Sequence, residues 1–461
     1  MSTKLDQAIF YGLMIVVVFA ALAHGVTEPW SVVLFGLMIG LLALVWVVRM
    51  IIEKSLVITI PTIALPLFGL LVFGIAQSLA LTDQTGRRLS LSMNVESTRE
   101  TVMLLAILFV ALMISANFLL GRERLRTLAK FMVIYGFVMA LFALVQYFAW
   151  NGQVYWLRPA PVTAFGPFAN HAHFAGYLEL LLPMPIALVV ARSVPRETRA
   201  LYGFTAVLMS IAIIASRSRG GMVSLVAEIM FIVALGTLLP QSEPNGQGRS
   251  KEARLKRALP VAAIVVVIVA GVFWIGADPI IKSMTIEDEM KGSAQLINRG
   301  SIWLSTWALV REHPLAGVGL GASQTAYPAY RQDNGLGGIF SQAHNDYLQV
   351  LAECGIVGGV LALWFIVSIL RLIFRGIRSR DPLLAGLALG SGAGIFGLLV
   401  HSLFDFNLQL PSHSLLFLLL SAVVSHLGAV AAQPEVEDAA EPELYGAVQV
   451  SAAGYAKGAS S

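Results

Sequence analysis

The sequence predicts an all-α polytopic membrane protein with about twelve transmembrane helices and one large loop outside the membrane. Hydrophobic residues make up 57% of the chain and charged residues only 13%, whereas about a quarter of a soluble domain is charged. The mean hydropathy is +0.77. Apolar runs of about 20 residues, the length that crosses a bilayer, recur along the chain. The one long polar interruption between them covers residues 278–345.

Each predicted span is an apolar run bounded by polar or charged residues. The spans are expected near residues 9–26, 30–50, 56–80, 100–119, 128–149, 172–191, 200–216, 221–239, 259–277, 346–370, 383–404 and 411–430. The first resembles a signal peptide, because Lys4 precedes it and Ala21–Ala23 has the small residues of a cleavage site. The second span follows almost at once, which favours a retained first helix.

The chain divides into four parts on this pattern. Residues 1–277 carry helices one to nine, residues 278–345 form the large loop, and residues 346–431 carry helices ten to twelve. Residues 432–461 are first acidic and then rich in Ala, Gly and Ser, which predicts a disordered cytoplasmic tail. The single cysteine, Cys354, excludes an internal disulfide and a cysteine metal cluster.

The positions of the basic residues predict the orientation. With a cytoplasmic N-terminus, about two thirds of the 31 Lys and Arg residues fall on the cytoplasmic side. The loop 278–345 then faces outward. These charges set the topology and contact anionic lipid headgroups, so the pI near 9.2 does not call for a nucleic-acid partner.

Four polar clusters fall on the outer side in this orientation. They are Phe165–Phe174, Ser216–Gly221, the loop with Arg299, Trp303 and His344, and His401–Asn407. Randomly placed polar residues would be shared between both sides, so their convergence predicts a functional site at the outer face. The sequence has no Asp-x-Asp, His-Glu-x-x-His or Walker motif, and we expect no metal, ATP or other cofactor.

The second cluster places Arg217 and Arg219 in a short Gly-containing turn without acidic neighbours. A guanidinium presents a planar fork of donors, so the two arginines suit a diphosphate. The alternative is that they extend to the lipid headgroups, as interfacial arginines usually do.

The loop cluster combines Arg299 and Trp303, which are four residues apart and therefore share a helical face, with Trp307 nearby. This face could hold a substrate, with Arg299 on a phosphate. An amphipathic helix that lies on the bilayer explains the tryptophans equally well.

His344 is the candidate catalytic residue, because an imidazole transfers protons near neutral pH. The alternative is a helix cap, together with Asn345 and Asp346. Asp405 follows His401 by one helical turn and could form a hydrogen bond with it. Candidates for substrate binding are Asn170, His171, Trp303, Asn345, His401 and Asp405. For the histidines other than His344, packing is the alternative.

The motifs together resemble the O-antigen ligase/polymerase superfamily, the WaaL/Wzy-like proteins with a Wzy_C domain. The resemblance rests on Arg299 with Trp303, Pro314–Gly319, His344–Leu348 with Glu353 and Gly355, Gly166–Phe168 with Asn170, and Ser218–Gly220. It covers the chain roughly from Phe165 to Pro411. The His-Asn and Pro-Leu-x-Gly-x-Gly motifs are fairly specific to this superfamily.

This resemblance implies a metal-independent glycosyltransferase of the C-type membrane fold, and direct displacement by a single base would make it an inverting enzyme. Its donor is a glycan on undecaprenyl diphosphate, at the periplasmic face of the bacterial inner membrane. Carried over by motif, Arg219 and Arg299 bind the diphosphate, with Arg217 as a competitor of Arg219, and His344 activates the acceptor hydroxyl. A histidine base and arginines in place of Mg²⁺ are consistent with this chemistry.

Within the superfamily, the segment His401–Asn407 followed by Pro411 favours a Wzy-type polymerase for O-antigen, capsule or exopolysaccharide. The alternatives are an O-antigen ligase of lipopolysaccharide biosynthesis, with lipid A-core as acceptor, and a protein O-oligosaccharyltransferase. A chain-length regulator protein is a candidate partner. A flippase for the same lipid is the alternative of another class, and it predicts repeat symmetry and broken helices at the midplane.

Overall fold

The computed structural model describes residues 2–82, 88–119, 121–159, 163–240, 302–330, 342–432 and 447–450. Among these residues, 10 helical segments are long and apolar enough to cross a membrane. They are α1 Ser2–Leu22, α2 Pro29–Glu53, α4 Val95–Phe118, α5 Arg122–Phe148, the pair α6 His171–Glu179 and α7 Pro183–Val190, η1 Arg196–Thr198 with α8 Arg199–Ala215, α9 Arg219–Gly236, α14 Asp346–Gly376, α15 Pro382–His401 and α16 Pro411–Val430. The prediction of an all-α polytopic membrane protein is confirmed.

Every predicted span except 259–277 coincides with described helices, and that span lies outside the described residues. The third span differs from the prediction. Leu56–Thr59 form the strand β1, and only Ala64–Ser78 (α3) are helical. The β-branched residues before Pro61 favour a strand, and the proline keeps Ile60 out of helical conformation. The sixth span breaks into α6 and α7 ahead of Pro183, which lacks a backbone N–H.

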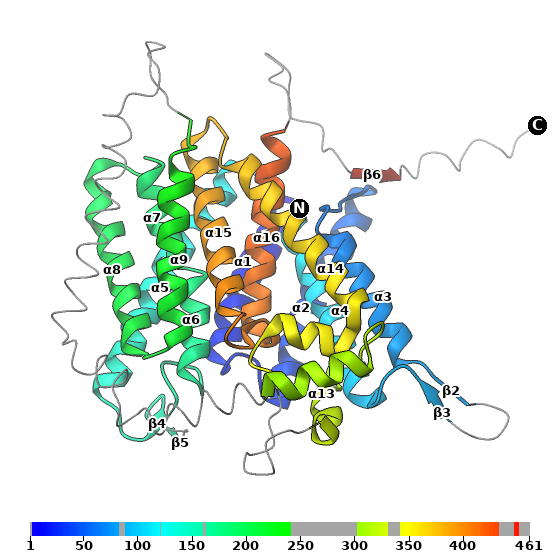
Figure 1. The fold of residues 1–461 in the computed structure, drawn as a ribbon. Coiled ribbons are helices and arrows are strands. Elements are labelled where there is room, and N and C mark those ends of the chain that lie inside the picture. Colours follow the sequence, from blue (N-terminus) through cyan, green and yellow to red (C-terminus); the bar gives the residue numbers. More distant parts are fainter. Residues whose placement is uncertain are drawn as a thin grey trace, which may run out of the picture.

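The spanning helices run roughly side by side, with α15 and α16 in the middle of the bundle (Figure 1). Every residue of α7 is buried. By contrast, α2 exposes Leu37, Leu41 and Leu44, as expected of a helix that faces lipid. The helices α7 and α15 approach closely at a glycine, because a Cβ on Gly390 would lie 3.0 Å from Cα of Met184.

Short elements gather at one end of the bundle, at the bottom of Figure 1. They are the hairpins β2 Ala80–Thr82 with β3 Arg88–Ser90 and β4 Gln153–Val154 with β5 Arg158–Pro159, the helix α13 Ser323–Ala326, and the 3-10 turns η2 Tyr327–Tyr330 and η3 Asn407–Gln409. Near the opposite end, β6 Ala447–Val450 pairs with β1. The tail was predicted to be disordered throughout, and these four residues differ because alternating valines favour a strand.

The long helix α14 is broken at Gly355, whose backbone has φ 59° and ψ −155°. The segment Pro314–Gly319 supplies the backbone partners that the break leaves unpaired. The N–H groups of Val318 and Gly319 donate to the carbonyls of Ala352 and Glu353, and the N–H of Ile356 donates to the carbonyl of Pro314. The Pro-Leu-x-Gly-x-Gly motif is therefore the structural counterpart of the break in α14.

Close backbone contact at this break requires glycine. A Cβ on Gly317 would lie 2.3 Å from the carbonyl carbon of Glu353, and one on Gly355 would lie 2.4 Å from that of Leu315. Gln77 of α3 closes the junction. Its Nε2 donates to the carbonyls of Ala316 and Glu353, and its Oε1 accepts from the N–H of Leu320. The half-helix that begins at Asp346 is thus fixed to the loop segment.

Candidate functional site

His344 lies at the start of α14, at the end of the bundle where the short elements gather. Its Nδ1 is 3.2 Å from Oδ1 of Asp405, and its ring meets that of Phe406 edge-on, with 4.9 Å between the centroids. The His344 side chain is 25% exposed and the Asp405 side chain 4%. A buried carboxylate therefore fixes one ring nitrogen while the imidazole remains accessible.

The helix cap of α14 is Asn345, so the alternative that His344 caps this helix is wrong. Asn345 Oδ1 accepts from the N–H of Leu348 at 2.9 Å, and Nδ2 donates to the carbonyl of Leu403 at 3.1 Å. His344 precedes the cap with a left-handed φ of 49°. The cap leaves the imidazole available for chemistry.

Asp346 docks the start of α14 onto the turn between α15 and α16. Its Oδ2 accepts from Ser402 Oγ at 2.8 Å and from the N–H of Leu408 at 3.2 Å. Its own N–H donates to the carbonyl of Ser402 at 2.9 Å. These bonds place His344 opposite Asp405, which belongs to the same turn.

The charge of Asp405 determines the tautomer of His344. Burial alone would raise the pKa of Asp405, but the hydrogen bond with His344 and the neighbouring imidazoles of His173 and His401 lower that pKa below its ordinary value. An ionised carboxylate only accepts hydrogen bonds, so Nδ1 of His344 carries the proton. In the neutral ring, Nε2 is then the proton acceptor.

Trp303 supports His344 from the loop side. Its indole N–H donates to the carbonyl of Ala343 at 3.0 Å. The ring therefore holds the residue next to His344, and binding of substrate by Trp303 stays a prediction. Arg299, which shares a predicted helical face with Trp303, lies outside the described residues.

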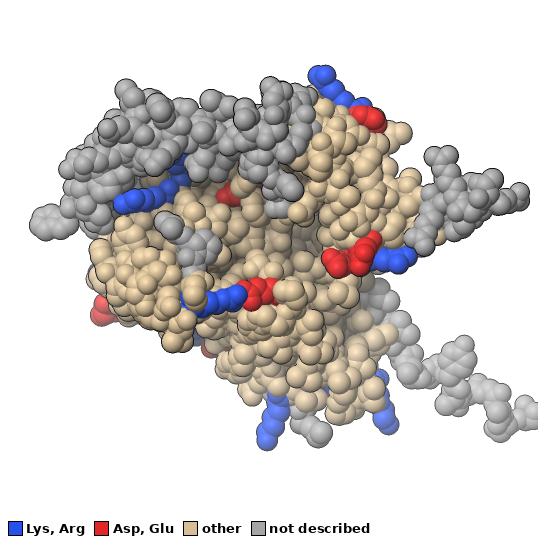
Figure 2. Space-filling view, turned by 90° about the horizontal axis from the view of Figure 1, so that it is seen from below, with Lys and Arg blue, Asp and Glu red and all other residues tan. Residues whose placement is uncertain are grey.

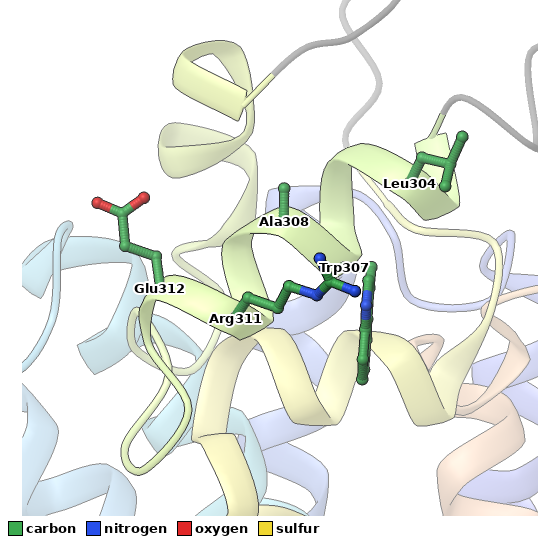
Figure 3. A pocket seen from close by; sticks show the side chains of 5 residues that line it. All are labelled: Leu304, Trp307, Ala308, Arg311 and Glu312. Carbon is green, nitrogen blue, oxygen red and sulfur yellow. The ribbon is translucent and has the colours of Figure 1, made fainter.

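Trp303 belongs to a helix formed by residues 302–312. This helix borders a cavity of about 480 Å³ lined by Leu304, Trp307, Ala308, Arg311 and Glu312 (Figure 3). The Arg311 guanidinium lies over the Trp307 ring, 5.8 Å from its centroid. An aromatic face beside a cation and a carboxylate offers both a flat apolar surface and hydrogen-bonding groups.

The arginine turn, Ser216–Gly221, connects α8 to α9 at this end of the bundle. Ser218 caps α9, with its Oγ accepting from the N–H of Gly221 at 3.0 Å. Arg217 has a left-handed φ of 59°, and the side chains of Arg217 and Arg219 are both exposed. A helix N-terminus with two arginines is electropositive, which suits an anionic group.

His401 does not bind Asp405 as predicted. Its Nδ1 lies 3.0 Å from Oε1 of Glu179 on α6, and both side chains are completely buried. Asp405 is turned toward His344, and only its backbone N–H reaches the carbonyl of His401. The prediction failed because His401, the last residue of α15, points its side chain into the bundle. The turn that carries Asp405 runs away from the bundle.

The cluster at the start of α6 packs beside the turn that carries Asp405. Asn170 caps α6, with Oδ1 accepting from the N–H of Ala172. His171 is partly buried. The ring of His173 lies 4.9 Å from that of Phe406, on which His344 also packs. The structure thus brings the described residues of all four polar clusters to one end, and substrate binding by Asn170, His171, Asn345, His401 and Asp405 stays a prediction.

Figure 2 views this end of the molecule, where the charged side chains of the described residues are few and several blue ones lie next to a red one. The buried polar residues that were not predicted as site residues include Gln77, Glu179 and Glu228. Glu179 and Glu228 each lie in an apolar span. An ionisable residue within a span is a signal of function, and this signal could have identified both. Gln77 gave no signal, since its partners are backbone atoms distant in sequence.

Residues 204–363 match the family model of the O-antigen ligases, Wzy_C. The predicted resemblance to the O-antigen ligase/polymerase superfamily is confirmed over this part of the chain. The Wzy_C match contains the arginine turn and His344, whereas Asp405, Glu179 and the start of α6 lie outside it. No curated protein matches the chain.

The Wzy_C match supports an enzyme of glycan assembly, of the ligase or polymerase type and resembling a glycosyltransferase. Together with the apolar helices, it indicates a multi-pass membrane protein. Ligases and polymerases share this domain, so the match does not separate them.

Proposed function

We propose that this protein polymerises glycan repeat units carried on undecaprenyl diphosphate, as a Wzy-type polymerase for O-antigen, capsule or exopolysaccharide. The observation that carries the proposal is the His344–Asp405 pair, with Nδ1 and Oδ1 at 3.2 Å, at the membrane end where the arginine turn also lies. Such a pair is suited to deprotonating a hydroxyl.

The reaction is a direct displacement at the anomeric carbon of the donor. Nε2 of His344 takes the proton of an acceptor hydroxyl, whose oxygen forms the new glycosidic bond. The bond between the anomeric carbon and the diphosphate oxygen breaks, and the diphosphate leaves with the electron pair. Asp405 stabilises the imidazolium that forms. A single displacement inverts the anomeric centre, as in inverting glycosidases.

The leaving diphosphate gains negative charge as its bond breaks. We assign its stabilisation to Arg219 and Arg299, with Arg217 as a further ligand, because guanidinium forks match phosphate oxygens. The chemistry then needs no divalent metal. Full turnover in EDTA is the expected result, and a strict requirement for a divalent ion would contradict the arginine assignment.

The acceptor glycan is assigned to the side of His344 where residues 302–312 lie. The Trp307 face with Arg311 and Glu312 borders the cavity there, and sugars present both apolar faces and hydroxyls. The site is proposed to face the periplasm at the inner membrane. A chain-length regulator protein is a proposed partner.

The polymerase is preferred to a ligase because the segment His401–Asn407, which favours polymerases by sequence, supplies Asp405. The ligase, which transfers the glycan to lipid A-core or to protein, is the second candidate because the Wzy_C match covers both. Deletion of the gene distinguishes them. Loss of a polymerase leaves single repeat units on the acceptor, loss of a ligase leaves polymer on undecaprenyl diphosphate, and loss of a flippase leaves units facing the cytoplasm.

A further inference from the structure

The imidazole of His401 lies where three parts of the chain meet. Its Nδ1 is 3.0 Å from Oε1 and 3.1 Å from Oε2 of Glu179 on α6. Neither side chain is exposed. A bidentate approach by a buried carboxylate fixes the plane of the ring, so the position of Nε2 on its far side is also fixed.

The far side of the ring meets the arginine turn. A Cβ on Gly220 would lie 2.5 Å from Nε2 and 2.6 Å from Cδ2 of His401. Gly220 follows Arg219 directly, in the first turn of α9. Glu179 reaches the same place, since its Oε1 would be 3.2 Å from a Cβ on Gly221. The pair therefore packs against the backbone that carries Arg219.

His401 is also the first residue of the turn that carries Asp405. Its carbonyl accepts from the N–H of Phe404 at 2.8 Å and from the N–H of Asp405 at 3.1 Å. One residue thus contacts the arginine turn through its side chain and Asp405 through its backbone.

We propose that Glu179 and His401 are positioning residues that set the distance between the arginine turn and the His344–Asp405 pair. They touch no substrate. Their role is to keep the diphosphate on Arg219 in line with the hydroxyl that His344 deprotonates. This inference rests on the proposed function, and it replaces substrate binding as the role of His401.

Two substitutions test the contact between His401 and Gly220 from opposite sides. Gly220→Ala places a methyl group against the rigid imidazole and must displace the turn. His401→Asn keeps an N–H donor near the position of Nδ1 for Glu179 but removes the ring atoms that face Gly220. Tyr177→Phe is the matched control. Tyr177 lies on the same helix as Glu179, and the substitution removes its buried hydrogen bond with Tyr135 but leaves the turn untouched.

The measurements use the full chain in detergent: the affinity for undecaprenyl diphosphate, the KM for the lipid-linked donor, kcat, and the thermal transition. We expect Gly220→Ala to weaken undecaprenyl diphosphate binding roughly tenfold and to raise the donor KM. His401→Asn should do the same, because the turn loses its support. In the double variant, the added methyl group meets no ring, so binding should be no weaker than in His401→Asn alone. Tyr177→Phe should bind like wild type.

Wild-type affinity in both Gly220→Ala and His401→Asn would overturn the inference, and so would losses that simply multiply in the double variant. A weakening of binding in Tyr177→Phe equal to that in His401→Asn would reduce the pair to a general contribution to stability. If the wild-type chain itself fails to bind undecaprenyl diphosphate, the proposed donor is wrong and the inference falls with it. Binding by wild type with no difference among the variants overturns the inference alone.

Discussion

His344 and Asp405 are 61 positions apart in the chain, and their side chains meet at 3.2 Å. The first residue precedes α14 and the second follows α15. The pair therefore forms only when the start of α14 and the end of α15 lie at the same depth. The bonds from Asp346 to Ser402 and Leu408 enforce that depth.

The first prediction concerns the base. His344→Ala should insert into the membrane and bind undecaprenyl diphosphate but form new glycosidic bonds about 10²- to 10⁴-fold more slowly, the usual contribution of a positioned base. His344→Gln should be nearly as slow, because an amide cannot accept the proton. Single-turnover assays with purified protein measure this step. Polymer of normal length and yield from either variant would rule His344 out as the base.

The second prediction concerns Asp405. Asp405→Asn should lower turnover by about 10- to 100-fold, because the imidazole loses the partner that orients it. Asp405→Asn should still bind undecaprenyl diphosphate like wild type, because Asp405 acts on His344 and not on the donor. Single-turnover rates and donor binding of the purified variant test this split. Wild-type turnover in Asp405→Asn would separate Asp405 from the proton transfer.

The stability of the fold in acid gives a separate prediction for Asp405. The pKa of Asp405 is lowered in the folded protein, so its contribution to stability is complete above an unfolded pKa of about 4. It is lost only as the pH falls further, through the lowered pKa. Thermal transitions should therefore show no loss from this group between about pH 5 and about pH 8.

The third prediction compares the two arginines of the turn. Arg219→Ala should lower kcat/KM, because charge-assisted bonds to the diphosphate are lost. The loss of transition-state stabilisation should be about 3 kcal/mol. Arg219→Lys should retain part of the activity, since it keeps the charge without the fork. The same substitutions at Arg217 should cost less, because Arg217 precedes the cap of α9. A larger loss at Arg217 would reverse the assignment.

The fourth prediction concerns the junction between α3 and the break in α14. Gln77→Leu should lower the free energy of unfolding by about 2–4 kcal/mol, because the carbonyl of Ala316 and the N–H of Leu320 lose their side-chain partner and the carbonyl of Glu353 keeps only the N–H of Gly319. Turnover of the folded fraction should also fall, as His344 directly precedes the cap of the half-helix that this junction fixes. Asn117→Leu is the control: Asn117 also binds backbone, at Thr59 and Met113, so it should lower stability without affecting turnover. Equal turnover in the two variants would remove Gln77 from the support of the site.

The fifth prediction concerns topology. Cys354 is completely buried, so the wild-type chain should react little with thiol reagents. A cysteine in place of Leu315, which is 70% exposed, should react with a membrane-impermeant reagent in intact spheroplasts. A cysteine in place of Arg378, in the connection between α14 and α15, should react only after lysis. The reverse pattern would place the site in the cytoplasm.

Much of the fold follows from local patterns. The apolar runs predicted the helices, because each must satisfy its backbone groups internally to cross a membrane. The strand β1 within the third predicted span shows where this fails: hydropathy registers Val57 and Ile58 as apolar but does not distinguish strand from helix.

The candidate site was predictable only as a set of residues. Polar clusters on one predicted side identified His344, Arg219 and Asp405, but their pairing depends on how α14 and α15 dock. His401 illustrates the limit, since its spacing to Asp405 fits a helical turn while its ring binds Glu179, 222 positions away. Contacts at such separations carry no periodic signal.

The break at Gly355 has a mechanical consequence. The half of α14 beyond it exposes Val360, Leu363 and Trp364, and we expect such a lipid-facing surface to tilt when bilayer thickness changes. The half before it is bonded to Pro314–Gly319 and to the turn after α15. We therefore expect the broken helix to act as a joint, so that the alignment of the base persists in membranes of different thickness.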